Sequence, residues 1–128
     1  MNAFGMDLAQ WLWLLSSIIT VESNGRVDAV GDGGKAIGIL QIHACVIVDV
    51  NRVHGTSFSL DDRENPDKSL DIAYLYLSHW GKSYHRKTGN APTTETLSRI
   101  WNGGPNGWKK EATVKYWNKV NNQLQATK

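Results

Sequence analysis

Apolar residues recur along much of the chain at helical spacing, and the first such segment begins after Asp7, a residue that can cap a helix. Its apolar positions lie three or four residues apart and are predicted to share one helix face: Leu8, Leu12, Leu15 and Ile19. The same rhythm reaches an acid, Glu22, at the end of this face. Asn24 and Gly25 tolerate left-handed backbone and are expected to end the helix. The acid on an apolar face is the first anomaly in the pattern.

The next segment, residues 26–38, interrupts the helical pattern with four glycines and two acids. This composition predicts a loop or a short, irregular hairpin. Helical spacing returns over residues 39–53, so we expect a second helix there that Gly55 ends. Asn65 and Pro66 form a strong start signal for a long third helix, which we expect to fray from Lys82 to Gly89.

Two further helices are predicted in the C-terminal part. The fourth begins at Thr93 or Thr94 and is expected to end at Trp101, before a tight glycine-rich loop over residues 102–107. The fifth begins near Lys109, and its predicted buried side is formed by Ala112, Tyr116, Val120 and Leu124. The pattern therefore predicts one mostly α domain over residues 1–128. It has about five main helices and a small irregular or β segment near residues 26–38.

Composition and charge narrow the class of protein. The chain has 128 residues, about the length of one domain, and a formal net charge of +2. Nucleic-acid binding usually needs a concentrated basic face, so we expect no nucleic-acid partner. Six Trp residues are many for this length, and we expect some of them to contact a ligand. The single cysteine, Cys45, lies in an apolar run and is predicted to be a buried, inert thiol.

The apolar run from Trp11 to Val21 is predicted to be neither a signal peptide nor a membrane-spanning segment. No basic residue precedes it and no small-residue cleavage site follows it, so it does not resemble a signal peptide. It is also too short to span a bilayer, and we expect no stable membrane insertion. The four histidines lack metal-ligand spacing and no serine sits in a nucleophile elbow, so neither a metal nor another cofactor is expected.

Glu22 and Asp32 are the candidate catalytic acids. A carboxyl at the end of an apolar stripe is desolvated, which raises its pKa and lets it donate a proton to a leaving oxygen, as glycoside cleavage requires. The alternative is that Glu22 only ends the helix and points to water. Asp32 could activate a water for an inverting hydrolysis if it faced Glu22 across a cleft. The alternative for Asp32, within GDGG, is that it only holds a turn.

The segment 21–42 resembles the signature of the lysozyme-like superfamily and is most similar to soluble lytic transglycosylases and goose-type lysozymes. The matching motifs are Glu22-Ser23 at a helix end and Gly38-Ile39-Leu40-Gln41 at the next helix start. The later Ala-Tyr-Asn-x-Gly motif of the family resembles residues 100–104, and its final Tyr resembles Tyr116. The resemblance covers roughly residues 12–120 and implies an α+β lysozyme-like fold.

The resemblance also implies roles for nine residues. Glu22 would be the general acid and then the base. Seven residues would bind or orient the substrate around it: Ser23, Ile39, Gln41, His43, Trp101, Asn102 and Tyr116. Asp32 resembles the first further acid of goose-type lysozymes. The position of the second is His43, which cannot serve as a carboxylate base, and the family's Tyr before the Asn is Trp101 here.

The resemblance, together with these residues, implies a muramidase that cuts the β-1,4 bond between N-acetylmuramic acid and N-acetylglucosamine. We favour lysozyme-type hydrolysis with Asp32 as the water base. The alternatives are lytic transglycosylation with Glu22 as sole acid and base, and a non-catalytic module that binds wall glycans. We expect a monomer whose partner is the peptidoglycan glycan strand. Its expected place of action is the bacterial cell wall, as a phage lysin or an exported mature form.

Overall fold

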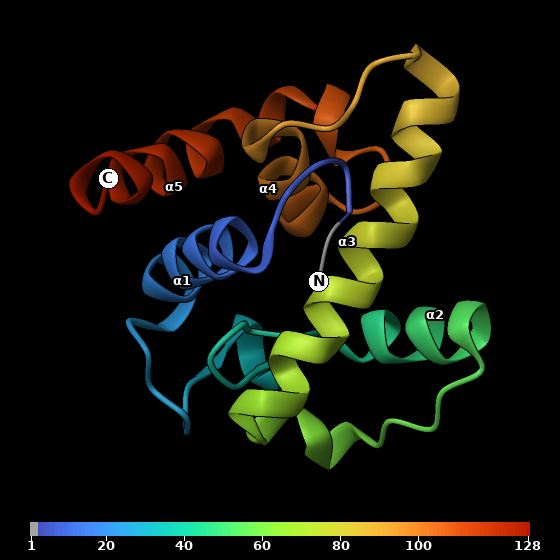
Figure 1. The fold of residues 1–128 in the computed structure, drawn as a ribbon. Coiled ribbons are helices and arrows are strands. Elements are labelled where there is room, and N and C mark those ends of the chain that lie inside the picture. Colours follow the sequence, from blue (N-terminus) through green and yellow to red (C-terminus); the bar gives the residue numbers. More distant parts are fainter. Residues whose placement is uncertain (1–2) are drawn as a thin grey trace. The chain divides into compact units, whose positions relative to one another are not determined.

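The computed structural model describes residues 3–128, and within that range it contains five α-helices and one short hairpin (Figure 1). The helices are α1 (Leu8–Ser23), α2 (Ala44–His54), α3 (Pro66–Thr88), α4 (Thr94–Gly103) and α5 (Val114–Ala126). The strands β1 (Val30–Gly31) and β2 (Ala36–Ile37) pair antiparallel. Four 3-10 turns complete the described structure: Asp32–Gly34, Leu60–Glu64, Gly107–Lys109 and Glu111–Thr113. The predicted mostly α class with a small β segment is confirmed.

The chain forms two compact units. The first combines the chain up to Val21 with Leu77–Lys128, and the second is the continuous segment Glu22–Tyr76. The boundaries fall inside two helices, so the last two residues of α1 and the first half of α3 belong to the second unit. No helix in residues 3–128 is both long and apolar enough to cross a membrane.

The buried face of α1 is rotated from the predicted one. Its fully or almost fully buried residues are Trp11, Leu14, Leu15 and Ile18, whereas Leu8 and Leu12 are 49% and 42% exposed. The prediction was therefore wrong for these two leucines, because the chain offers a second set of apolar positions at the same spacing. Glu22 follows Ile18 by four residues and still continues the buried face. Asp7 caps the helix as predicted, since its carboxylate accepts from the Gln10 N–H at 2.9 Å.

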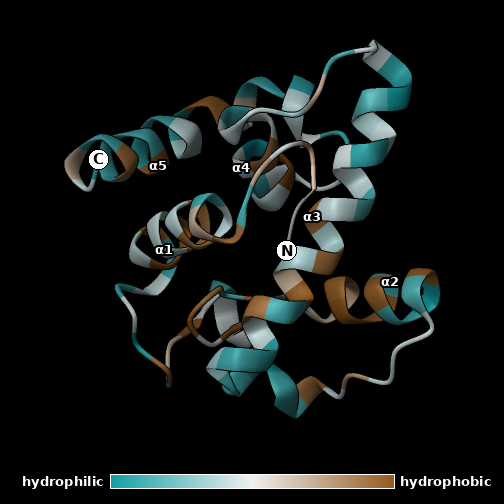
Figure 2. Ribbon diagram, in the orientation of Figure 1, coloured by the Kyte–Doolittle hydropathy of each residue, from teal (hydrophilic) through white to brown (hydrophobic). Residues whose placement is uncertain are grey.

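In the first unit, α3 and α4 are longer than predicted. The end of α3 does not fray but stays helical to Thr88, whose hydroxyl donates to the Tyr84 carbonyl at 2.9 Å. Gly89 then ends the helix with φ +77°. α4 continues two residues past Trp101, so Asn102 lies in its last turn and not in the loop. Figure 2 shows that the last turns of α3 are largely hydrophilic.

The fifth helix starts later than predicted. Residues 107–113 form two 3-10 turns, and α5 begins only at Val114. Ala112 is exposed as a result, whereas Val120 and Leu124 are buried as predicted.

The second unit differs from the prediction mainly at the start of α2. Residues 39–43 are not helical, because Ile37 and Ile42 form a bridge with hydrogen bonds of 3.0 and 3.3 Å in the two directions. α2 begins at Ala44, and Gly55 ends it with φ +66°, as predicted. Cys45 is exposed, which corrects the predicted buried thiol. Ile47 and Val50 form the buried side of α2, and Cys45 lies about 200° around the helix from Ile47.

Candidate functional site

The end of α1 is tied to the turn that precedes α2. Glu22 is partly buried and is the last residue but one of the helix. The next residue, Ser23, is buried, and its hydroxyl donates to the Ile39 carbonyl at 2.8 Å and accepts from the Gly25 N–H at 3.1 Å. These bonds fix the backbone next to Glu22 against the Gly38–Gln41 turn. The Ser23 hydroxyl thus joins the two motifs that carried the resemblance.

Asp32 lies at the tip of the hairpin, directly after β1, with φ +52°. Its Oδ2 atom is 3.1 Å from Nε2 of His43, the residue that precedes α2. The two side chains are 66% and 41% exposed, so water reaches both of them. Asp32 therefore holds a turn and also presents a carboxylate with one oxygen in contact with the His43 ring.

Gln41 folds back over the hairpin. Its Nε2 atom donates to the carbonyls of Gly38 at 2.9 Å and Ala29 at 3.2 Å. Its Oε1 atom lies against Gly31 so closely that a Cβ there would overlap it. The Gln41 amide nitrogen thus stabilises the turn around Asp32, and the absence of a side chain on Gly31 leaves room for the Gln41 oxygen.

Arg63 was not among the predicted residues, yet it supports the same turn. Its backbone carbonyl lies where a Cβ on Gly38 would be, and Gly38 also has φ +83°, so only glycine fits there without strain. The Arg63 guanidinium donates from Nη1 to the Ile42 carbonyl at 3.1 Å and from Nε to the Leu60 carbonyl at 2.9 Å. No sequence signal links Arg63 to Gly38, because 25 residues separate them along the chain.

A cavity of about 340 Å³ lies beside this turn in the second unit. Residues at the start of α2 and three basic side chains surround it. The lining residues are Gly34, Lys35, His43, Ala44, Cys45 and Arg63. His43 lines the cavity and contacts Asp32, so the cavity adjoins the proposed base. Within residues 3–128, no group of three or more His, Cys, Asp or Glu side chains is placed to hold a metal ion.

Three predicted site residues lie in the first unit. Trp101 and Asn102 occupy the last turns of α4, and Tyr116 lies in the first turn of α5. Packing explains two of the glycines that follow Asn102, whereas Gly104 has φ +86°. A Cβ on Gly103 would lie 2.5 Å from the Thr113 side chain, and one on Gly107 would overlap the Arg99 carbonyl.

The second unit thus holds six of the predicted residues: Glu22, Ser23, Asp32, Ile39, Gln41 and His43. The other three, Trp101, Asn102 and Tyr116, belong to the first unit. The resemblance also implies that Tyr116 approaches Glu22, and this stays a prediction.

Comparison with known proteins agrees with the motifs. The chain is 31% identical to "Lysozyme" of Ostrea edulis over 112 residues, which cover 85% of this chain and 77% of that protein. It is 32% identical to "Lysozyme" of Meretrix lusoria over 108 residues, or 83% of this chain and 84% of that protein. The sequence profile of the transglycosylase SLT domain matches residues 7–124. The chain therefore belongs to the transglycosylase SLT domain family.

Proposed function

We propose that this chain hydrolyses the β-1,4 bond between N-acetylmuramic acid and N-acetylglucosamine, with Glu22 as general acid and Asp32 as the base that activates water. The coarser assignment, a glycoside-cleaving muramidase or lytic transglycosylase that acts on peptidoglycan, follows from the family and from the lysozyme relatives. The mechanism and the residues are the proposal. We further propose that residues 1–128 act as one catalytic domain, as a monomer, at the bacterial cell wall.

The observation that favours hydrolysis is the contact between His43 and Asp32. A water base needs an accessible carboxylate oxygen in a fixed orientation. His43 holds Oδ2 at 3.1 Å, and the side chain of Asp32 is 66% exposed, which leaves Oδ1 for a water. This exposed carboxylate beside His43 supports the proposal that Asp32 is the general base and not only a turn residue.

The proposed reaction is a single displacement. Glu22 gives its proton to the glycosidic oxygen, and the bond from that oxygen to the anomeric carbon breaks. Asp32 takes a proton from a water, whose oxygen forms the new bond to the anomeric carbon. Carboxyl groups that work in this way stand ~6.5–9.5 Å apart in inverting enzymes. The products are two shorter glycans, one with a new reducing end.

The remaining predicted residues are proposed to bind or orient the glycan. Ser23 and Ile39 hold the backbone beside Glu22, and Gln41 holds the hairpin that carries Asp32. His43 orients Asp32 and also lines the adjoining cavity. Trp101, Asn102 and Tyr116 are proposed to contact the sugar, since aromatic faces and amide groups suit pyranose rings.

The runner-up is lytic transglycosylation with Glu22 as sole acid and base, which the family name favours. In that reaction the sugar's own hydroxyl attacks, and the product end is a 1,6-anhydro ring that is lighter by one water. Mass spectrometry of fragments released from purified peptidoglycan separates the two reactions. Reducing ends support our proposal, and anhydro ends contradict it. A wild-type protein that clears no wall suspension would instead indicate a non-catalytic glycan-binding module.

A further inference from the structure

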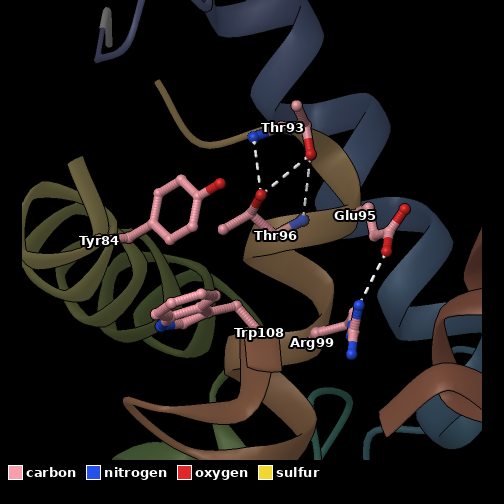
Figure 3. Close-up of a pocket in the computed structure, with 6 residues that line it drawn as sticks. All are labelled: Tyr84, Thr93, Glu95, Thr96, Arg99 and Trp108. Carbon is pink, nitrogen blue, oxygen red and sulfur yellow. Dashed lines mark hydrogen bonds and ion pairs between the residues drawn. The ribbon is translucent and has the colours of Figure 1, made fainter. Parts of the chain in front are cut away.

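A second cavity, of about 290 Å³, lies in the first unit between the end of α3 and the start of α4. It is lined by Tyr84, Thr93, Glu95, Thr96, Arg99 and Trp108, and Figure 3 shows these side chains. None of them is among the nine predicted site residues. Its volume is just below the ~300–1,000 Å³ that is usual for small-molecule sites.

One side of the cavity is aromatic. The rings of Tyr84 and Trp108 meet edge to face, with centroids 5.0 Å apart and planes at 78°. The Lys109 ammonium lies 5.6 Å from the centre of the Trp108 ring. Both rings are only partly buried, so apolar ring surface is left open toward the cavity. Such surface packs well against the C–H groups of a small ring.

The other side is polar and fixed in place. Arg99 donates to the Glu95 carboxylate at 2.9 Å, to the Thr113 hydroxyl at 2.8 Å and to the Lys110 carbonyl at 3.1 Å. The Arg99 side chain is 15% exposed, whereas that of Glu95 is 46% exposed. One Glu95 oxygen is therefore held by Arg99, and the carboxylate remains open to accept hydrogen bonds from a ligand.

The hydroxyls between the two sides are also ordered. Thr93 caps α4, since its hydroxyl accepts from the Thr96 N–H at 3.2 Å, and the Thr96 hydroxyl accepts from the Thr93 N–H at 3.1 Å. In the view of Figure 3, Thr96 lies between the Tyr84 and Trp108 rings and the Glu95–Arg99 pair. The cavity thus combines aromatic surface, a fixed carboxylate and hydroxyl groups on short, rigid elements.

We propose that this cavity binds one pyranose ring of a wall glycan, an N-acetylhexosamine, in addition to the sugars at the proposed catalytic residues. A pyranose has an apolar C–H face for the aromatic side and hydroxyl groups for Glu95. A lone anion suits the cavity less well, because the exposed charged group that lines it is the Glu95 carboxylate, which would repel an anion. The choice of sugar draws on the family's wall substrate, but the site does not depend on the roles of Glu22 and Asp32.

The cavity lies along the first part of α4, whereas Trp101 and Asn102, which are predicted to bind substrate, lie in its last turns. Trp101 lies about 200° around the helix from Arg99, and Asn102 lies about 10 Å further along it than Glu95, by helix geometry. A sugar bound here would hold a glycan strand on the protein while another part of it is cut. Such a second contact raises the local concentration of substrate without changing the chemistry.

The test is an NMR titration of the wild-type protein with N-acetylglucosamine, which has no glycosidic bond to cleave. We expect saturable shifts of the Trp108 indole signal and of the amides of residues 93–96, with a Kd on the order of millimolar for so small a ligand. Replacing Trp108 by Leu should weaken this binding about tenfold, because it removes an aromatic ring that packs against the sugar. Glu95→Gln, which keeps the side-chain shape but removes its charge and the ion pair with Arg99, should weaken it several-fold.

The matched control is Trp117→Leu, because Trp117 is a partly buried Trp of the same unit that does not line the cavity. It should leave the shifts of residues 93–96 unchanged. The proposal is overturned if N-acetylglucosamine produces no saturable shifts there, or if Glu95→Gln binds like the wild type. It is also overturned if an alanine peptide with a free carboxylate shifts these signals and the sugar does not.

Discussion

Nε2 of His43 lies 3.1 Å from Oδ2 of Asp32, so a histidine at the start of α2 holds the carboxylate at the tip of the hairpin. His43 stands where the resemblance places a second acid, and it cannot replace that acid as a base. Its contact with Asp32 gives it another role, that of a positioning residue. The contact restrains one oxygen of Asp32 and leaves the carboxylate accessible to water.

This contact predicts the behaviour of His43 variants. His43→Ala should lower kcat about tenfold with little change in KM, because a loosely held base loses orientation before it loses substrate contacts. His43→Gln keeps a donor in nearly the same place and should recover much of the lost kcat. Steady-state kinetics on purified wall fragments would measure both. A rise in KM with kcat unchanged would instead assign His43 to sugar binding alone.

Replacing Glu22 and replacing Asp32 should affect activity in different ways. Glu22→Gln should reduce wall clearing about 10²–10⁴-fold, since it removes the proton donor and keeps the shape. Asp32→Asn should reduce the release of reducing ends about 10²-fold or more, because an amide cannot accept the proton of the water. Mass spectrometry of the fragments, with circular dichroism as a folding control, provides the measurement. Full activity of Asp32→Asn would exclude Asp32 as the general base. Full activity of Glu22→Gln would exclude Glu22 as the general acid.

Much of the local structure could be predicted from the sequence. Asp7, Gly25 and Gly55 act through their neighbours along the chain, and the helix ends that they mark are confirmed. The start of α2 could not be predicted, because the apolar spacing of residues 39–43 is compatible with a helix. The bridge between Ile37 and Ile42 turns that segment into the return of a hairpin.

The candidate site, like the fold, could be predicted from the sequence only in part. The motif residues Glu22, Ser23 and Gln41 were identified from short patterns, and the structure adds the hydrogen bonds that link their turns. Their chemical roles remain predictions. Arg63 and the contact of His43 with Asp32 escaped prediction, since each depends on residues brought together only by the fold.

Gly38 provides a stability test of this turn. Gly38→Ala should lower the free energy of unfolding by roughly 2–4 kcal/mol, because the new Cβ would overlap the Arg63 carbonyl and φ is +83°. Gly33→Ala is the matched control, since Gly33 has φ +66° but nothing within 4 Å of a Cβ. It should cost only about 1 kcal/mol. Urea unfolding of the three proteins measures the difference, and equal losses would show that the close approach of Arg63 does not matter.

The burial of Tyr76 leads to a prediction of how the free energy of unfolding changes at alkaline pH. Burial, together with the smaller effects of the charges of Asp49 and Cys45, raises the pKa of its hydroxyl to about 12. The unfolded chain ionises first, near its ordinary pKa of about 10, so the folded state loses stability as the pH rises from about 10 to 12. The difference of about two units between the folded and unfolded pKa of Tyr76 corresponds to a loss of at most about 3 kcal/mol in the free energy of unfolding. Tyr76→Phe cannot ionise and should lose less stability over this range. Urea unfolding of both proteins at pH 9 to 12 provides the measurement, and parallel curves would show that Tyr76 does not cause the loss.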